Sequence, residues 1–410
     1  MEQKYLPLLL LAVVLSIALV AMINNRFNRQ EGGKLKRVRA PSPRLGAPTP
    51  NTLRDLTFAQ RRTCPTGESP PEFLVINWKD KYLGGLGHTY ALASYALTMA
   101  ARYGLQPVWR PENAQGVDSN HGIRVADFAR FTGLDRLPTP RQLPPGTVRI
   151  EIPCSNETDC RNYVNPVARL QTSPIDFVAT TEWIEAQRDR YPCRPRAFEL
   201  VHSIGYPYEL LCSGIYAPGL DLVRYLWRHG AGYAIPEQYS DGSLHIAAHV
   251  RLSDGMKHPT PRQFATLVNT AVEVALRLSG KRVALQVHSD GPVEELQEWV
   301  RHIEKRHLHK FTMVSSNSSI SFYDAFRHLV FAHVLLTCQS SLSQFAALLA
   351  RGVVVYPMGP KDCMWHGATC PVVVGERELQ NATQHFDYST MALMLNRLQE
   401  GKCMWAPYHE

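Results

Sequence analysis

The regular alternation of strand and helix patterns across residues 245–357 constrains the fold of this chain more than any other feature. Apolar, β-branched runs such as 245–251 and 353–357 alternate with amphipathic helical patterns such as 261–280. Strands and helices that alternate at this spacing predict an α/β fold, with a parallel, doubly wound sheet covered by helices on both faces. A strand–loop–helix–strand pattern over 73–109 predicts a second α/β domain nearer the N-terminus.

The N-terminal stretch LPLLLLAVVLSIALVAMI, residues 6–23, is apolar and uncharged. Its length is at the short end of the range for a membrane-spanning helix. We expect a signal anchor behind a cytoplasmic tail of residues 1–5, and a single-pass type II protein whose body lies in the lumen of the Golgi or ER. Two alternatives stay open: a cleaved signal peptide, and the reverse orientation, which the basic C-terminal flank favours under the positive-inside rule.

The excess of positive over negative charge lies in one segment of the chain. Residues 24–62 hold ten Lys and Arg against Glu31 and Asp55, which already equals the net charge of +8 for the whole chain. The remainder is close to neutral, so the charge does not indicate a nucleic-acid partner. The segment 24–69 is rich in Pro and basic residues and lacks periodicity, and we expect it to be a flexible stem.

Cysteines and glycosylation sequons also favour a lumenal body. Nine cysteines leave at least one unpaired, and we expect Cys338, in a predicted buried strand, to be the free thiol. Close spacing is compatible with disulfides in three pairs, although sequence does not fix the connectivity: Cys154 with Cys160, Cys193 with Cys212, and Cys363 with Cys370. Of the three sequons, we expect glycans on Asn156 or Asn381 rather than on Asn317.

Polar side chains follow several of the predicted strands, at the sheet edge where α/β proteins bind ligands. Arg251 offers a forked cationic donor to a diphosphate, or pairs with Asp254. Asp290 is a turn residue or a ribose ligand. Asp324 is a first-turn residue that complements a helix dipole, or a purine ligand. His249, inward-facing by alternation, hydrogen-bonds a base or satisfies itself in the core.

Two further motifs lie at predicted helix starts. Ser340, Ser341 and Ser343 precede an apolar helix, and Ser341 with Gln344 has the spacing of a capping box. The same helix start is suited to bind a phosphate. The motif GGLGHTY, residues 84–90, is a glycine loop before a helix, either a tight structural turn or a phosphate contact, with a histidine at position 88.

The motifs occur in the order GGLGHTY, HVRLSDG, VHSDGP, VSSNSSIS with YDAF, and LLTCQSSLSQFAALLA. This order resembles the fucosyltransferase superfamily of GT-B type, most closely its α1,6-fucosyltransferase branch with the signature H-x-R-R-x-D, over roughly 73–110 and 245–357. The resemblance implies two Rossmann-like domains facing a cleft, and inverting, metal-independent transfer of fucose from GDP-fucose to a glycan or glycoprotein acceptor. The expected parts are an acceptor-side domain at 70–235, a donor-binding domain at 236–375 and a tail segment at 376–410.

The resemblance also implies roles for individual residues: guanine recognition by His249 and Asp324, β-phosphate binding by Arg251, diphosphate contacts from Ser340 and Ser341, and the glycine loop at Gly85 and Gly87. Two departures affect the site. Leu252 stands where the family often has a second arginine, and no glutamate follows Asp254 closely, so Asp254 is the first candidate for the catalytic base and His88 the second.

No D-x-D sequence occurs in the chain, and hard cations need such oxygen ligands, so we expect neither a metal nor another cofactor. Two alternatives to a fucosyltransferase stay open. One is a GT-B transferase that uses another nucleotide sugar. The other is an inactive relative that binds a glycan or a nucleotide without turnover.

Overall fold

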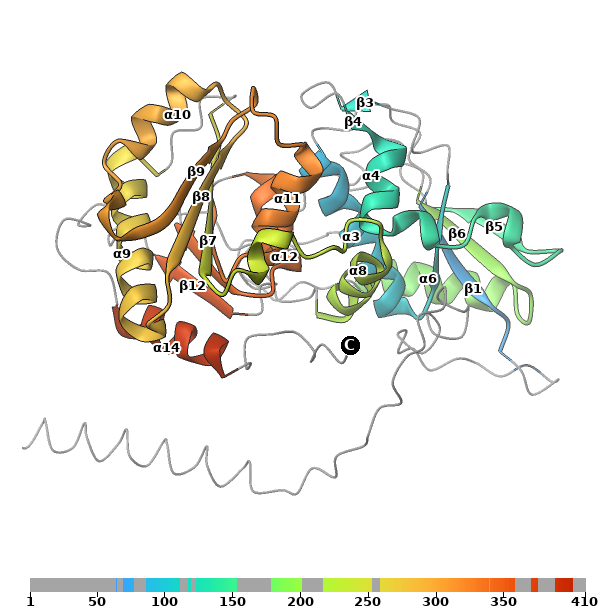
Figure 1. The fold of residues 1–410 in the computed structure, drawn as a ribbon. Helices are drawn as coiled ribbons and strands as arrows, with labels where there is room; N and C mark the ends of the chain where they lie inside the picture. The colour runs from blue at the N-terminus through green and yellow to red at the C-terminus, as the bar shows by residue number, and fades with distance from the viewer. Residues whose placement is uncertain are drawn as a thin grey trace, which may run out of the picture. The chain divides into compact units, whose positions relative to one another are not determined.

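The computed structural model describes the body of the chain in segments (Figure 1). The described residues are 64, 69–76, 86–110, 117–118, 123–152, 178–200, 217–252, 259–338, 340–357, 370–374 and 388–400. The expected signal anchor and nearly all of the stem lie outside these residues, as do Gly85, Asp254 and the three sequons except Asn317. No helix in the described part of the chain is long and apolar enough to cross a membrane.

The first sheet has four parallel strands in the order β2-β1-β6-β5. Their bounds are β1 Glu72–Ile76, β2 Gln106–Trp109, β5 Val148–Glu151 and β6 Arg196–Leu200. The helices of this region are α3 Leu86–Tyr103, α4 Val125–Thr132, α6 Val178–Arg190 and α8 Ala217–His229. A two-residue antiparallel pair, β3 Val117–Asp118 with β4 Ile123–Arg124, precedes α4.

The second sheet has six parallel strands in the order β12-β11-β10-β7-β8-β9. Their bounds are β7 Leu244–Val250, β8 Val283–Ser289, β9 Leu308–Val314, β10 Val334–Leu336, β11 Val353–Pro357 and β12 Cys370–Val374. The intervening helices are α9 Pro261–Ser279, α10 Val293–Val300, α11 Phe322–Phe331 and α12 Ser341–Leu349, and α14 Tyr388–Gln399 follows β12. The α/β class is confirmed, with two parallel sheets as in the GT-B architecture that the resemblance implied.

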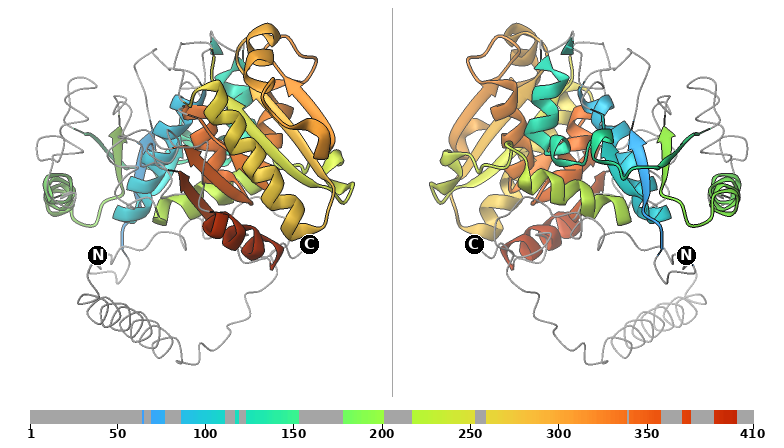
Figure 2. Two further views of the ribbon diagram at one scale, coloured as in Figure 1. Left: turned by 90° about the vertical axis from the view of Figure 1, so that its left-hand side faces the viewer. Right: turned by 90° about the vertical axis from the view of Figure 1, so that its right-hand side faces the viewer.

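Side-chain alternation places two separate cores on the two faces of the second sheet. Ile246, Ala248 and Val250 of β7 pack with α9, α10 and α14, whereas Ala247 packs with α11 and α12. Figure 2 shows α14 beside the lower end of α9. The segment expected as a C-terminal tail therefore contains a helix that covers this sheet.

The core on the α11 and α12 side continues into α3, α4 and α8 of the first sheet's region. Aromatic rings make much of this contact. The Phe128 ring of α4 lies 6.3 Å from Phe326 of α11 and 6.4 Å from Phe345 of α12, and Trp227 of α8 lies 5.8 Å from Phe326. A shared core of this kind holds α11 and α12 in fixed positions behind the edge of the second sheet.

The helix boundaries follow local chemistry. Helix α9 begins after Thr260, whose hydroxyl accepts a hydrogen bond from the Gln263 backbone N–H in a capping box, and it ends at Gly280, which has the left-handed φ of 59°. Helix α10 ends at Val300, after eight residues. Residues Lys305–His307 form a separate 3-10 turn.

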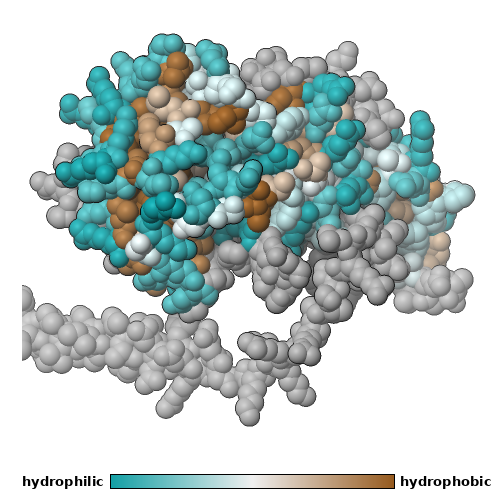
Figure 3. All heavy atoms as spheres, viewed as in Figure 1, coloured by the Kyte–Doolittle hydropathy of each residue, from teal (hydrophilic) through white to brown (hydrophobic). Residues whose placement is uncertain are grey.

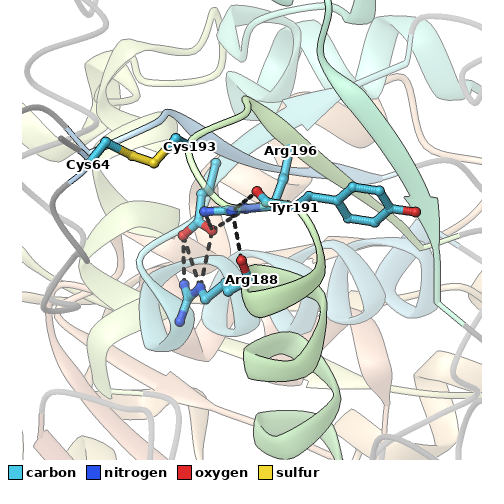
Figure 4. Close-up of a disulfide and its surroundings, with 6 residues drawn as sticks. Cys64, Arg188, Tyr191, Cys193 and Arg196 are labelled. Carbon is cyan, nitrogen blue, oxygen red and sulfur yellow. Dashed lines mark hydrogen bonds and ion pairs between the residues drawn. A yellow bond between two sulfur atoms is a disulfide. The ribbon is translucent and has the colours of Figure 1, made fainter. Parts of the chain in front are cut away.

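The first sheet is tied together by buried charges and one disulfide (Figure 4). Cys64 is bonded to Cys193, in the loop before β6, so the suggested pairing of Cys193 with Cys212 is wrong. Below it, the guanidinium groups of Arg188 and Arg196 both bind the carboxylate of Glu72, at 2.7 Å each. Cys338 is the free, buried cysteine of the described part of the chain, as expected.

The surface of the described residues on the face of Figure 3 is mostly hydrophilic, with apolar side chains in small separate groups. Among the described residues, the exposed large hydrophobic side chains are Ile235 and Leu393. They stand singly, which is normal for a protein surface. The polar groups at the sheet edge are therefore the better guide to function.

Candidate functional site

The carboxyl ends of neighbouring strands β7 and β10 bring two of the predicted motifs together. Strand β7 ends at Val250, directly before Arg251, and its neighbour β10 leads through Cys338 and Ser340 into α12. The thiol of Cys338 is hydrogen-bonded to the backbone of Arg251 and lies 3.8 Å from the Ser343 hydroxyl. The side chain of Cys338 thus bridges the end of β7 and the start of α12.

The start of α12 differs from the expected capping box. The helix begins at Ser341, so the N-cap is Ser340, and within the described residues its side chain makes no capping hydrogen bond. The first-turn hydroxyl that acts locally is that of Ser343, which donates to the carbonyl oxygens of Cys338 and Ser340 at 3.1 Å each. The serine cluster therefore orders the backbone of the strand–helix turn by a route that its spacing did not predict.

Asp290 acts on the backbone of the neighbouring strand. Its Oδ1 accepts a hydrogen bond from the backbone N–H of Leu252 at 2.8 Å. A Cβ added to Gly291 would lie 2.5 Å from the Cβ of Leu252, so only glycine fits there. Asp290 and Gly291 together fix the chain just beyond Arg251, and the turn interpretation of Asp290 gains direct support.

Asp324 lies in the first turn of α11 and takes part in its N-cap. The hydroxyl of Ser321 donates to its Oδ2 at 2.7 Å and accepts from its backbone N–H. Arg327 donates to its Oδ1 at 2.8 Å. These contacts lower the pKa of Asp324, with Ser321 the largest cause. The carboxylate is 52% exposed and faces a ligand-sized space.

That space is a pocket of about 540 Å³ between α11 and the 3-10 helix Glu237–Ser240. Asp324 and His328 line it from α11, while Gln238 and Asp241 line it from the segment before β7. The amide nitrogen of Gln238 lies 3.0 Å from His328 Nε2. The side chains of Gln238 and His328 are therefore within hydrogen-bond distance of each other on the wall of the pocket.

A cluster of buried histidines, which no sequence motif indicated, adjoins His328 on the wall of this pocket. His288 of β8 pairs in register with His249 of β7, and its ring lies 5.7 Å from that of His328. The ring of His245 stacks on Tyr239 at 4.2 Å, and His333 Nδ1 accepts from the His245 backbone N–H. Strand alternation placed His249 inward, and the same pattern applies to His245 and His288; their neighbours come from distant parts of the chain.

The buried histidines predict that the free energy of unfolding decreases in acid. Burial lowers the pKa of His328 and of His333 to about 4, from about 6.5 in the unfolded chain. Below pH 6.5 the unfolded chain takes up protons that the folded protein excludes, so stability is complete above pH 6.5 and falls until about pH 4. We expect each histidine to cost about 2 kcal/mol at pH 5. Urea unfolding at pH 7 and pH 5 measures this loss.

His328→Gln should reduce the difference in unfolding free energy between pH 7 and pH 5 by the contribution of one histidine. His309→Gln, at an exposed position of β9, is the matched control and should leave the pH dependence unchanged. An unfolding free energy of the wild type that is the same at pH 7 and pH 5 would show that the buried histidines do not titrate in this way.

The glycine-loop candidates are only partly described. The sequence predicted that Gly87 and His88 lie in a loop before a helix. Helix α3 begins at Leu86, so both residues belong to its first turn instead. No group of three or more His, Cys, Asp or Glu residues suited to a metal ion occurs among the residues with a described position.

No protein-family model and no curated protein matches the chain. Similar solved structures include the spinosyn rhamnosyltransferase SpnG with spinosyn aglycone, at 10% identity and a TM-score of 0.30, covering 81% of this chain and 93% of that one. The E. coli heptosyltransferase WaaC with ADP has 14% identity and a TM-score of 0.31, with coverages of 81% and 99%. S. aureus MnaA with UDP has 10% identity and a TM-score of 0.31, with coverages of 79% and 90%.

At these identities and TM-scores, the function of the chain has to be argued from its own residues. Those residues define an α/β protein with two parallel sheets. Arg251 and the start of α12 lie at the carboxyl edge of the second sheet, and the pocket lies between α11 and the segment that precedes β7. A helix start at a sheet edge is suited to bind a phosphate, and the pocket presents the polar side chains of Gln238, Asp241 and Asp324.

Proposed function

We propose that the protein is an inverting, metal-independent glycosyltransferase that moves fucose from GDP-fucose to a glycan or glycoprotein acceptor. The observation that carries the proposal is the contact between the backbone of Arg251 and the turn that starts α12, through the Cys338 thiol. A guanidinium and a helix N-terminus on one sheet edge provide two kinds of anion stabilisation for one diphosphate.

The chemistry needs little else at the donor. Breaking the bond between the sugar and the diphosphate places negative charge on the β-phosphate, and fixed positive groups stabilise that charge as it develops. In this proposal the Arg251 guanidinium and the first N–H groups of α12, with Ser340 and Ser341, do so without a metal. Asp324, whose exposed carboxylate lines the pocket, is assigned together with His249 to recognition of the guanine of the donor.

The acceptor side of the proposal rests on sequence. The acceptor hydroxyl needs a base, for which Asp254 is the first candidate and His88 the second, and the loop of Gly85 and Gly87 approaches the donor from the N-terminal domain. We further propose a Golgi or ER membrane protein of type II with a lumenal body. The disulfide between Cys64 and Cys193 supports an oxidising compartment.

An inactive, ligand-binding relative is the second candidate, and Leu252 favours it. At the position of the family's second arginine, Leu252 packs against Gly291 and donates its N–H to Asp290. This position therefore has a structural role, and only one arginine is left at the end of β7 for the phosphates. Contacts to the phosphates matter most in the transition state, where the leaving group gains charge. A protein with fewer of them is therefore expected to lose turnover before it loses nucleotide affinity.

Release of GDP separates the two candidates. The full-length protein is incubated with GDP-fucose in EDTA, with and without a mixture of N-glycopeptides, and GDP is quantified. We expect GDP formation that increases when the glycopeptides are added and that does not require a divalent metal. GDP-fucose binding without any GDP release above the rate of an Arg251→Ala control would favour the inactive relative.

A further inference from the structure

The thiol of Cys338 is buried among three polar groups of the proposed phosphate-binding edge. Its sulfur lies 3.3 Å from His249 Nδ1 and 3.8 Å from Ser343 Oγ, and it is hydrogen-bonded to the backbone of Arg251. Cys338 is 7% exposed and His249 is 4% exposed. One buried sulfur thus joins the last residues of β7 to the first turn of α12.

The hydrogen-bond partners determine where the thiol proton points. Burial raises the pKa of Cys338 to about 12, so the thiol is protonated at neutral pH. The Ser343 hydroxyl already donates to two carbonyl oxygens, those of Cys338 and Ser340. A backbone N–H is a donor, so Arg251 donates to the sulfur. Ser343 Oγ and His249 Nδ1 are both able to accept the thiol proton, and His249 Nδ1 is the nearer of the two, at 3.3 Å against 3.8 Å, so we assign it as the acceptor.

We propose that Cys338 is a positioning residue that holds His249 as the Nε2–H tautomer and fixes the backbone of Arg251. A neutral imidazole that accepts at Nδ1 carries its proton on Nε2, so His249 is set as a donor at that nitrogen. The consequence for nucleotide binding rests on the proposed function, whereas the tautomer itself does not.

The choice of cysteine follows from these contacts. Alanine at position 338 would remove the sulfur that lies 3.3 Å from His249 Nδ1, and the loss of a hydrogen bond to a buried polar group is costly. Serine offers the same donor and acceptor on a shorter bond. Cys338→Ala should therefore release the tautomer, and Cys338→Ser should largely restore it.

Nitrogen-15 NMR of the full-length protein, labelled at histidine, tests the tautomer directly. The His249 signals are assigned by their loss in His249→Gln. We expect an unprotonated Nδ1 and a protonated Nε2 in the wild type and in Cys338→Ser, and a mixture of tautomers in Cys338→Ala. Thr337→Val is the matched control, because it removes the buried hydrogen bond from Thr337 to the Val355 carbonyl one residue away.

A protonated Nδ1 of His249 in the wild type would overturn the proposal, and so would unchanged His249 signals in a folded Cys338→Ala protein. Melting temperatures of all variants show that each is folded. Titration with GDP adds the functional part: we expect Cys338→Ala to bind about tenfold more weakly, with recovery in Cys338→Ser. Absence of GDP binding to the wild type would contradict the proposed function and leave the tautomer result standing.

Discussion

Arg251→Ala is expected to lower kcat/KM for GDP-fucose about a hundredfold, with little change in melting temperature. Arg251 follows a fully buried strand at the carboxyl edge of the second sheet. In the proposed reaction its contact with the β-phosphate strengthens as the leaving group gains charge, so the loss affects rate as well as binding. We estimate about 3 kcal/mol of transition-state stabilisation. Steady-state kinetics and melting curves on the same preparation measure both quantities.

Two variants sharpen this test. Arg251→Lys should recover only part of the activity, because an ammonium lacks the fork of a guanidinium. Arg262→Ala removes the same charge from an exposed position in the first turn of α9 and should leave kcat/KM unchanged. If Arg251 is structural, Arg251→Ala would lose stability and keep near-normal turnover per folded molecule, and that result would remove Arg251 from the donor site.

Glu72→Ala is expected to lower the free energy of unfolding by about 4 kcal/mol. The Glu72 carboxylate is 5% exposed and binds Arg188 Nη2 and Arg196 Nη2, each at 2.7 Å (Figure 4). Removing it leaves two buried or nearly buried guanidinium groups without their shared counter-charge. Urea unfolding of the variant and the wild type measures the loss.

Glu273→Ala is the matched control, since Glu273 pairs with Arg277 on the exposed surface of α9. Such exposed pairs contribute less than about 1 kcal/mol. Glu72→Gln keeps the shape of the side chain but not its charge. Its loss of unfolding free energy should lie between those of Glu72→Ala and Glu273→Ala. A Glu72→Ala protein within about 1 kcal/mol of the wild type would show that water reaches the two arginines and compensates them.

The second sheet was predictable because its elements carry strong local signals. The strands expected at 245–251 and 353–357 appear as β7 and β11, and the helix expected at 261–280 is α9 with its capping box. Fully buried parallel strands are continuous apolar runs, and the helices between them have clear apolar faces. Local pattern alone defines such elements.

The first sheet was harder to predict, for reasons visible in β5 and β6. Strand β6, RAFEL, contains Arg196 and Glu199, which are buried yet charged. Arg196 is compensated by Glu72, which lies 124 residues away in the sequence. Strand β5, VRIE, is an edge strand with alternate residues exposed. Both strands depend on distant partners that a local pattern does not contain.

The same distinction applies to the site. Strand ends predicted that Arg251 and the serine turn would meet at one edge, because parallel strands share their direction. The role of Cys338 between His249 and Ser343, and the histidine cluster beside the pocket, come from contacts between elements. The disulfide from Cys64 to Cys193 spans 129 residues and likewise has no local signal.

Calorimetric titration of the full-length protein with GDP-fucose and UDP-N-acetylglucosamine in EDTA tests the central claim most directly. Asp324→Ala changes the pocket that is proposed to bind guanine, and Glu273→Ala is the surface control. We predict that GDP-fucose binds the wild type and the surface control, that UDP-N-acetylglucosamine binds more weakly, and that Asp324→Ala reduces the difference. Tighter binding of UDP-N-acetylglucosamine, or GDP-fucose binding that disappears on chelation, would contradict the account.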